Sequence, residues 1–223
     1  MSNYVVACSK HWFRLTLADA ENRNNFIFIK NKSEFNLERL KRINPRFIFI
    51  PHWNWIVSEE IFGQFECVVF HTAPLPFGRG GSPIQNLIVR GFKRAPVCAL
   101  RMNGVIDGGP IYSKVDISLR GSLAEIFERV NEAVNILINE IISSEPQPKE
   151  QEGNVVVFKR RLEKDNEIPN GLSLSDVYDR IRMLDGEGYP KAYFKFGDYL
   201  LKLESAELNE STVSAQVTIK KCE

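Results

Sequence analysis

Five short runs of consecutive apolar residues constrain the fold of this chain more than any other feature. They are rich in Val, Ile and Phe, lack the apolar–polar alternation of a half-exposed strand, and occupy 4–8, 26–29, 47–50, 67–70 and 97–100. Such runs are typical of strands that are covered on both faces. Helical patterns at 36–43, 58–62 and 83–89 separate several of them. Alternating strands and helices predict a parallel α/β sheet with right-handed crossovers.

A long helix at 122–142 closes this region. Ser122 and Glu125 form a capping box at its start, and apolar residues then recur at helical spacing. The stretch 143–152 holds Pro146 and Pro148 among charged and amide side chains, which is typical of a linker. We therefore expect a catalytic domain at 1–150 and a small C-terminal subdomain at 151–223.

The C-terminal subdomain combines a helix with antiparallel strands. A strand is predicted at 154–158 and a capped helix at 173–184. Further strands are predicted at 192–196, 199–203 and 213–219, the first two joined by a turn at Gly197 and Asp198. The aromatic residues of this region can cover the core or form a dimer contact, and we favour the core. The sequence leaves both a monomer and a homodimer open.

Charge and composition narrow the possible partners. The net charge is +1, and the chain from Asn154 onward carries eleven basic and twelve acidic residues, so neither nucleic acid nor an anionic membrane is expected as a partner. The start lacks the pattern of a signal peptide, and no apolar run is long enough to span a bilayer. Four scattered cysteines and three histidines show no metal-ligand spacing. We expect a cytoplasmic protein with reduced thiols and no metal.

A loop rich in proline and glycine follows the apolar run at 67–70 directly and begins at His71. Open α/β sheets bind ligands beyond the carboxyl ends of their strands, so His71 is placed to meet a substrate. The loop glycines would let the backbone approach a ligand closely, and Arg79 would face an anion such as a phosphate. The spacing is equally consistent with a buried structural histidine.

A second glycine-rich loop, 103–110, contains Asp107 between two predicted strands. A carboxylate among glycines and a proline is most often a solvated turn residue. The sequence pattern of this loop alone therefore leaves the role of Asp107 open.

Together, the two loops resemble the folate-dependent formyltransferase family. The matching residues, in order, are His71, Leu75-Pro76, Arg79-Gly80, Pro83 and Ile106-Asp107-Gly108-Gly109. The segment 177–190 is similar to the C-terminal part of family members that act on sugar nucleotides, such as those of pseudaminic acid pathways. The resemblance implies a Rossmann-like parallel sheet, trimmed because only seventy residues precede His71. It also implies transfer of a formyl group from 10-formyltetrahydrofolate to the amine of a nucleotide-linked sugar, preferably a UDP-linked 4-amino sugar.

The resemblance assigns roles to individual residues. His71 would move the proton of the amine near neutral pH, and Asp107 would orient its ring. The residues expected to bind the folate donor are Trp53, Trp55, Ile106 and Gly108. Those expected to bind the nucleotide sugar are Lys10, Trp12, Gly78, Arg79 and Gly80. Trp12 is equally consistent with a side chain that simply caps the core.

In the family, the amine attacks the formyl carbon and forms a tetrahedral intermediate with an oxyanion. An asparagine two residues before the histidine helps to stabilise that oxyanion, but this sequence has Val69 at the position. Asn54, near the end of the preceding predicted strand, is a possible substitute, and His52 lies in the same stretch. These residues could instead only line the folate pocket.

Three other functions compete with the sugar-nucleotide hypothesis. An amine held on a carrier protein is one alternative, and a non-catalytic relative that binds a nucleotide sugar is another. Formylation of methionyl-tRNA is disfavoured because the C-terminal region is short and slightly acidic.

Overall fold

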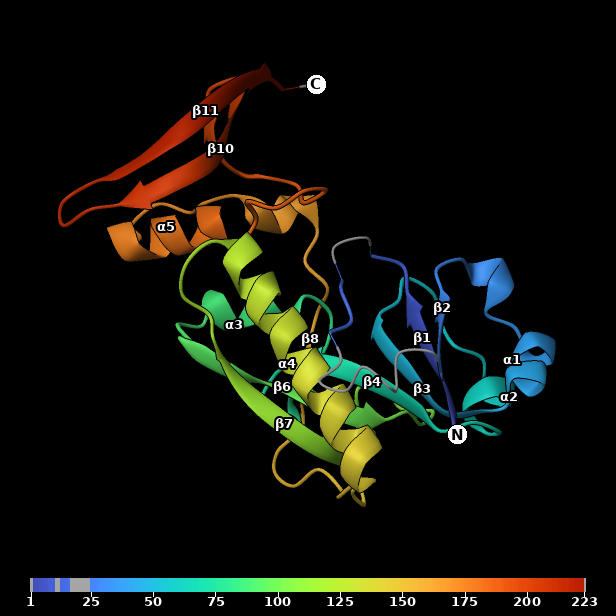
Figure 1. The fold of residues 1–223 in the computed structure, drawn as a ribbon. Helices are drawn as coiled ribbons and strands as arrows, with labels where there is room; N and C mark the ends of the chain where they lie inside the picture. Colours follow the sequence, from blue (N-terminus) through green and yellow to red (C-terminus); the bar gives the residue numbers. More distant parts are fainter. Residues whose placement is uncertain (1, 11–12, 17–24, 223) are drawn as a thin grey trace.

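The computed structural model describes residues 2–10, 13–16 and 25–222. They form a six-stranded sheet, its covering helices and a smaller C-terminal layer (Figure 1). The strand order of the main sheet is β2-β1-β3-β4-β6-β7. Its strands are β1 (Asn3–Cys8), β2 (Phe26–Ile29), β3 (Pro45–His52), β4 (Cys67–Thr72), β6 (Arg94–Arg101) and β7 (Ile111–Ser118). All five predicted apolar runs lie in strands of this sheet.

The sheet is covered on both faces, which explains its continuous apolar runs. Along β3, Phe47 and Phe49 belong to one core, whereas Ile48 and Ile50 belong to the other. The first core is closed by α3 (Pro83–Ile88) and α4 (Leu123–Ser144), and the second by α1 (Leu37–Ile43) and α2 (Glu59–Phe62). Because neighbouring residues of a strand point to opposite faces, both sets must be apolar.

The capping box predicted for the long helix α4 is confirmed. Ser122 Oγ accepts a hydrogen bond from the backbone N–H of Glu125 at 3.2 Å, and Glu125 Oε2 accepts one from the backbone N–H of Ser122 at 2.7 Å. These two bonds satisfy backbone donors that the first helical turn leaves free.

The direction of β6 differs from the prediction of a wholly parallel sheet. β1, β2, β3 and β4 pair in parallel, but β6 runs antiparallel to both β4 and β7. The chain between β4 and β6 forms β5 (Phe77–Gly80), which pairs with β8 (Val156–Phe158) in a separate sheet, and the six-residue α3. It therefore lacks the long helix that usually connects parallel neighbours.

The C-terminal region has the predicted helix and antiparallel strands. A short 3-10 helix, η3 (Glu163–Asn166), precedes α5 (Leu174–Arg182), and Ser173 caps α5 by accepting from the backbone N–H of Asp176. The sheet has the order β11-β10-β9 and consists of β9 (Ala192–Phe196), β10 (Tyr199–Leu208) and β11 (Val213–Lys221). It lies beyond α5, near the N-terminal end of α4 (Figure 1).

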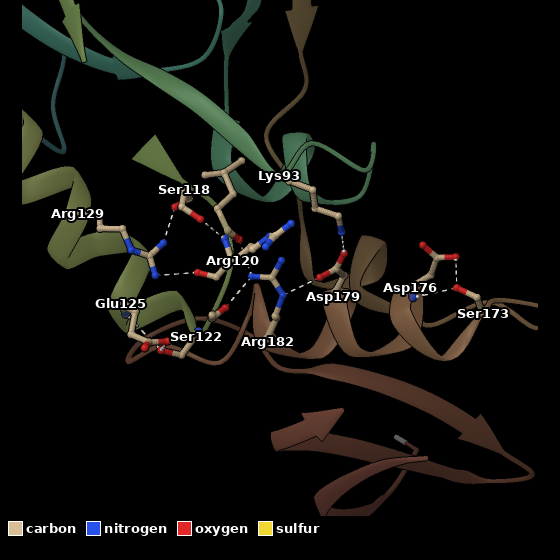
Figure 2. A network of polar contacts seen from close by, with 12 residues as sticks. Lys93, Ser118, Arg120, Ser122, Glu125, Arg129, Ser173, Asp176, Asp179 and Arg182 are labelled. Atoms are coloured by element: carbon tan, nitrogen blue, oxygen red, sulfur yellow. Dashed lines mark hydrogen bonds and ion pairs between the residues drawn. The ribbon is translucent and has the colours of Figure 1, made fainter. Parts of the chain in front are cut away.

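A buried ion pair on α5 anchors the C-terminal region to the N-terminal region, which contains the main sheet (Figure 2). Arg182 Nε donates to Asp179 Oδ1 at 2.6 Å, and its Nη1 donates to the carbonyls of Leu119 and Gly121 at 2.8 and 2.7 Å. Lys93 adds a second cation, 3.1 Å from Asp179 Oδ2. These contacts fix the position of α5 against the loop that leads into α4.

The stretch predicted to be a linker packs against the N-terminal region that contains the main sheet. The backbone of Lys149 exchanges hydrogen bonds of 2.7 and 2.9 Å with Ile111, at the start of β7. The division into 1–150 and 151–223 therefore stays a proposal. None of the helices in the described ranges combines the length and apolarity that a bilayer span requires.

Candidate active site

The two loops singled out in the sequence meet at His71 and Asp107. His71 lies near the end of β4 and is 7% exposed. Its Nδ1 lies 3.4 Å from Asp107 Oδ2, and its Nε2 lies 2.7 Å from the carbonyl oxygen of Gly78. Asp107 Oδ2 also accepts a hydrogen bond from the backbone N–H of Gly80 at 2.8 Å. Because a carbonyl can only accept, Nε2 carries a hydrogen, and Nδ1 is the basic nitrogen of the neutral ring.

Gln151 supports the Asp107 loop from outside. Its Nε2 donates to the carbonyl oxygens of Asp107 and Gly109, each at 2.8 Å. Its Oε1 accepts from Nε and Nη2 of Arg79 at 3.0 and 2.8 Å. Asp107 itself has a positive φ of 49°, which is unfavourable for a residue with a side chain. The Arg79–Gln151 contact thus helps to hold the loop that presents the carboxylate.

The glycines of the His71 loop serve packing against β8. A Cβ on Gly80 would lie 2.5 Å from the carbonyl oxygen of Phe158, and one on Gly78 would lie 2.8 Å from the Phe158 ring. Both glycines also have positive φ angles, 94° for Gly78 and 97° for Gly80. The close approach expected with a ligand is therefore made with the protein's own β8 strand.

His71 and Asp107 line a cleft of about 1130 Å³. One set of lining residues comes from the end of β3, from the loop between β3 and α2, from α2 itself and from the loop after β6. This set is rich in aromatic and aliphatic side chains: Trp53, Trp55, Ile56, Val57, Val105 and Ile106. A second set comes from the start of α3, from the segment after β8 and from the loop after α5, and it includes Ser82, Gln85, Arg160, Arg161, Asn166 and Tyr189.

The predicted binding residues, together with the predicted catalytic residue Asn54, divide into two groups. Those that line the cleft are Lys10, Trp53, Trp55 and Ile106. Those that do not line it are Asn54, Gly78, Arg79, Gly80 and Gly108, and Trp12 lies outside the described residues. Arg79 was expected to face an anion, but its guanidinium group is engaged by Gln151. The structure therefore brings only part of the expected substrate site to the cleft.

Val69 lines the cleft and lies on the same face of β4 as His71, so the position of the family asparagine is filled by an apolar side chain. Asn54 is exposed and does not line the cleft, so its placement does not support a substitution. Asn103, whose sequence context carries no signal of a functional role, does line it. Its Oδ1 accepts from the backbone N–H of Val105 at 2.9 Å, which leaves its amide N–H groups as donors.

His52 also lines the cleft, at the end of β3. Burial lowers the pKa of His52 to about 4, and the nearby charge of Lys10 contributes in the same direction. The imidazole is therefore neutral near pH 7. Among the described residues, no group of three or more His, Cys, Asp or Glu side chains is placed to hold a metal ion.

Comparisons with known proteins identify the family. The model described as "Methionyl-tRNA formyltransferase, C-terminal domain" matches residues 163–220. The solved structure "Methionyl-tRNA formyltransferase from Clostridium thermocellum" is 41% identical, covers 99% of this chain and 100% of that chain, and has a TM-score of 0.89. The chain belongs to the formyltransferase family. The resemblance found in the sequence is thereby confirmed at this level.

Other relatives bear on the subgroup. A methionyl-tRNA formyltransferase of Sulfurihydrogenibium sp. is 28% identical over 196 residues, which are 84% of this chain and 62% of the relative. The chain spans less than two thirds of the length of such curated relatives. A sugar N-formyltransferase from Shewanella sp. is 16% identical with a TM-score of 0.67, over 93% of this chain and 99% of that chain, which shows a shared fold alone. The sugar-nucleotide subgroup inferred from the sequence is not confirmed.

Proposed function

We propose that the protein is an N-formyltransferase that moves a formyl group from 10-formyltetrahydrofolate to a primary amine. The contact between His71 Nδ1 and Asp107 Oδ2, at 3.4 Å within the cleft, is the observation that carries this proposal. Membership in the formyltransferase family supports the same reaction.

The chain's own residues account for the proton. An amine that attacks a carbonyl carbon must lose a proton, and a neutral imidazole is suited to take it near neutral pH. Nδ1 of His71 is the nitrogen with a free lone pair, because Nε2 donates to Gly78. Asp107 then stabilises the cation that forms, and the same Nδ1 can return the proton to the leaving nitrogen. The amine would add to the formyl carbon of 10-formyltetrahydrofolate to give a tetrahedral intermediate. The bond between that carbon and the folate nitrogen would then break, as the nitrogen takes the proton and leaves within tetrahydrofolate.

The aromatic side of the cleft fits the folate. The rings of Trp53 and Trp55 pack edge to face with centroids 4.8 Å apart. Ile56 and Ile106 are 96% and 78% exposed. Covering their apolar surface with a ligand would be favourable. We infer that a flat, largely apolar ring system lies against these four residues.

An amine held on a larger carrier is the substrate class that the relatives favour, and the names of the more similar ones specify methionyl-tRNA. A sugar nucleotide is the second candidate. The charge of the chain favours it, because the residues from Asn154 onward carry eleven basic and twelve acidic side chains, a poor surface for RNA. We rank the carrier-bound amine first, because the relative that supports it matches 99% of this chain.

The test is an incubation of the purified protein and 10-formyltetrahydrofolate with methionyl-tRNA or with UDP- and dTDP-linked 3-amino and 4-amino sugars, analysed by mass spectrometry. A formylated aminoacyl-tRNA would support the first candidate, and a formylated sugar the second. If none of the amines is formylated, although the protein still binds folate and the nucleotide sugars, the enzyme proposal is contradicted. That result would favour a binding protein that retains the fold.

A further inference from the structure

The segment 160–166, which follows β8, contacts the loop that begins at His71. The backbone N–H of Arg161 donates to Ser82 Oγ at 3.1 Å, and the backbone N–H of Gly81 donates to the Phe158 carbonyl at 3.0 Å. A Cβ on Gly81 would lie 2.5 Å from the Cα of Arg160, so the two backbones are in close contact. A ligand bound by this segment would therefore be held beside the loop whose Gly80 contacts Asp107.

The positive charge of this segment is not neutralised by the carboxylates beside it. Arg160 and Arg161 both line the cleft, and within the described ranges neither guanidinium group lies within ion-pair distance of a carboxylate. Glu163 is paired with Lys202 at 3.1 Å, and Asp165 Oδ2 accepts from the backbone N–H of Leu162 at 2.8 Å.

Neighbouring arginines add to this positive charge. Burial lowers the pKa of Arg161, and the nearby guanidinium groups of Arg180 and Arg90 lower it further, against an opposite effect of Asp165. Glu187, in the loop after α5, also lines the cleft. Clustered cations in a partly buried site are favourable for a bound anion.

Two buried polar atoms of the segment have no hydrogen-bond partner among the described residues. One is Nε of Arg161, a donor, and the other is Oδ1 of Asn166, an acceptor. Asn166 is 4% exposed and lines the cleft, while its Nδ2 donates to the carbonyl of Pro190 at 2.9 Å. An unsatisfied buried polar group destabilises the protein, so a ligand that supplies the missing partners gains affinity.

We propose that the segment 160–166 binds a phosphate group of the amine substrate through Arg160 and Arg161, while Asn166 Oδ1 accepts from an N–H or O–H group of the same molecule. Guanidinium groups match phosphate in charge and hydrogen-bond geometry. That the ligand is the amine substrate rests on the proposed function, but the phosphate site itself does not. A nucleotide sugar and the acceptor end of a tRNA would both supply the phosphate.

Binding of inorganic pyrophosphate, UDP and deacylated tRNA, measured by titration calorimetry, tests the phosphate site. The variants are Arg160→Gln and Arg161→Gln, with Arg42→Gln as control, since Arg42 is an exposed residue of α1 outside the cleft. A hydrogen bond to a charged group contributes about 1.5–3 kcal/mol, so each cleft variant should raise the Kd about 10-fold or more. The control should bind as the wild type does.

The three probes distinguish the source of the phosphate. Tighter binding of UDP than of pyrophosphate indicates a nucleotide-linked substrate, and tight binding of tRNA alone indicates an RNA carrier. If the wild type binds no probe, or both cleft variants bind as tightly as the wild type, the phosphate site is refuted. Arg161→Gln also loses a hydrogen bond to the carbonyl of Asp165, whereas the exposed Arg160 has no such contact among the described residues. Arg160→Gln therefore remains informative if Arg161→Gln unfolds.

Failure of this proposal can be separated from failure of the proposed function. Anion binding that is weakened in the variants, in a protein that formylates no amine, would leave the site standing and remove the reaction. Formyl transfer with an unchanged KM for the amine in both variants would support the reaction and refute the role of the site in binding the amine substrate.

Discussion

Nδ1 of His71 lies 3.4 Å from Oδ2 of Asp107, so a strand end and a loop that are far apart in the sequence form one ion-pair site. Asp107 faces the nitrogen that has the free lone pair, because the other nitrogen of His71 donates to the carbonyl of Gly78. The carboxylate is therefore placed to stabilise the ring when it accepts a proton.

Asp107→Asn should lower kcat by about 10²–10⁴, the usual contribution of positioned acid–base catalysis. The amide keeps an oxygen that can accept from the backbone N–H of Gly80, but it cannot stabilise an imidazolium by charge. Single-turnover formyl transfer measures the effect. Asp116→Asn on β7, which changes an exposed carboxylate, is the matched control and should retain the wild-type rate.

Gln151→Ala should lower kcat about 10-fold, because two hydrogen bonds of about 0.5–1.5 kcal/mol each no longer hold the Asp107 loop. Gln151→Glu should not restore the rate, since a carboxylate pairs with Arg79 but cannot donate to the carbonyls of Asp107 and Gly109. Gln64→Ala, on the surface after α2, serves as control. A Gln151→Glu variant that matches the wild type in kcat and in its pH–rate profile would contradict this positioning role.

The contrast between Ser122 and Gln151 shows which parts of the structure the sequence could predict. Ser122 and Glu125 contact each other within one helical turn, so their spacing alone identified the helix start. The five strands with continuous apolar runs were equally predictable, because two cores require apolar residues at consecutive positions. Gln151 contacts Asp107 and Arg79 across distant segments, and a lone glutamine beside prolines carries no signal of such a contact. Likewise, a buried run such as 97–100 is equally apolar in either direction, so the antiparallel pairing of β6 was not predictable.

Arg182→Gln should destabilise the protein by about 3 kcal/mol, because removal of one partner of a buried ion pair leaves the charge of the other incompletely neutralised. Asp179 is 6% exposed and would keep only Lys93 as a cationic partner (Figure 2). Urea unfolding measures the change in the free energy of unfolding. Arg120→Gln replaces an exposed arginine in the loop before α4 and should have little effect. Equal stability of Arg182→Gln and Arg120→Gln would refute the anchoring role.

Glu66→Gln should destabilise the protein more at pH 7 than at pH 3. Burial tends to raise the pKa of Glu66, but hydrogen bonds from Tyr112 and Arg46 outweigh it and leave the pKa below the ordinary value of 4.5. A carboxyl group whose pKa is lowered by folding stabilises the protein above its unfolded pKa, and this stability is lost as the pH falls through the folded pKa. Unfolding free energies at both pH values, with the exposed Glu132→Gln on α4 as control, test this pH dependence. A loss of stability at pH 3 as large as that at pH 7 would contradict it.

Formyl transfer by the wild type and by His71→Ala tests the central claim most directly. Each protein is mixed with 10-formyltetrahydrofolate and the amine that the substrate panel identifies, and both tetrahydrofolate and the formylated product are quantified. We expect the wild type to form them in equal amounts. We expect His71→Ala to bind folate with the same affinity but to form product at least about 100-fold more slowly. An equal rate in the two proteins would show that His71 does not move the proton, and the mechanism proposed for this site would be wrong.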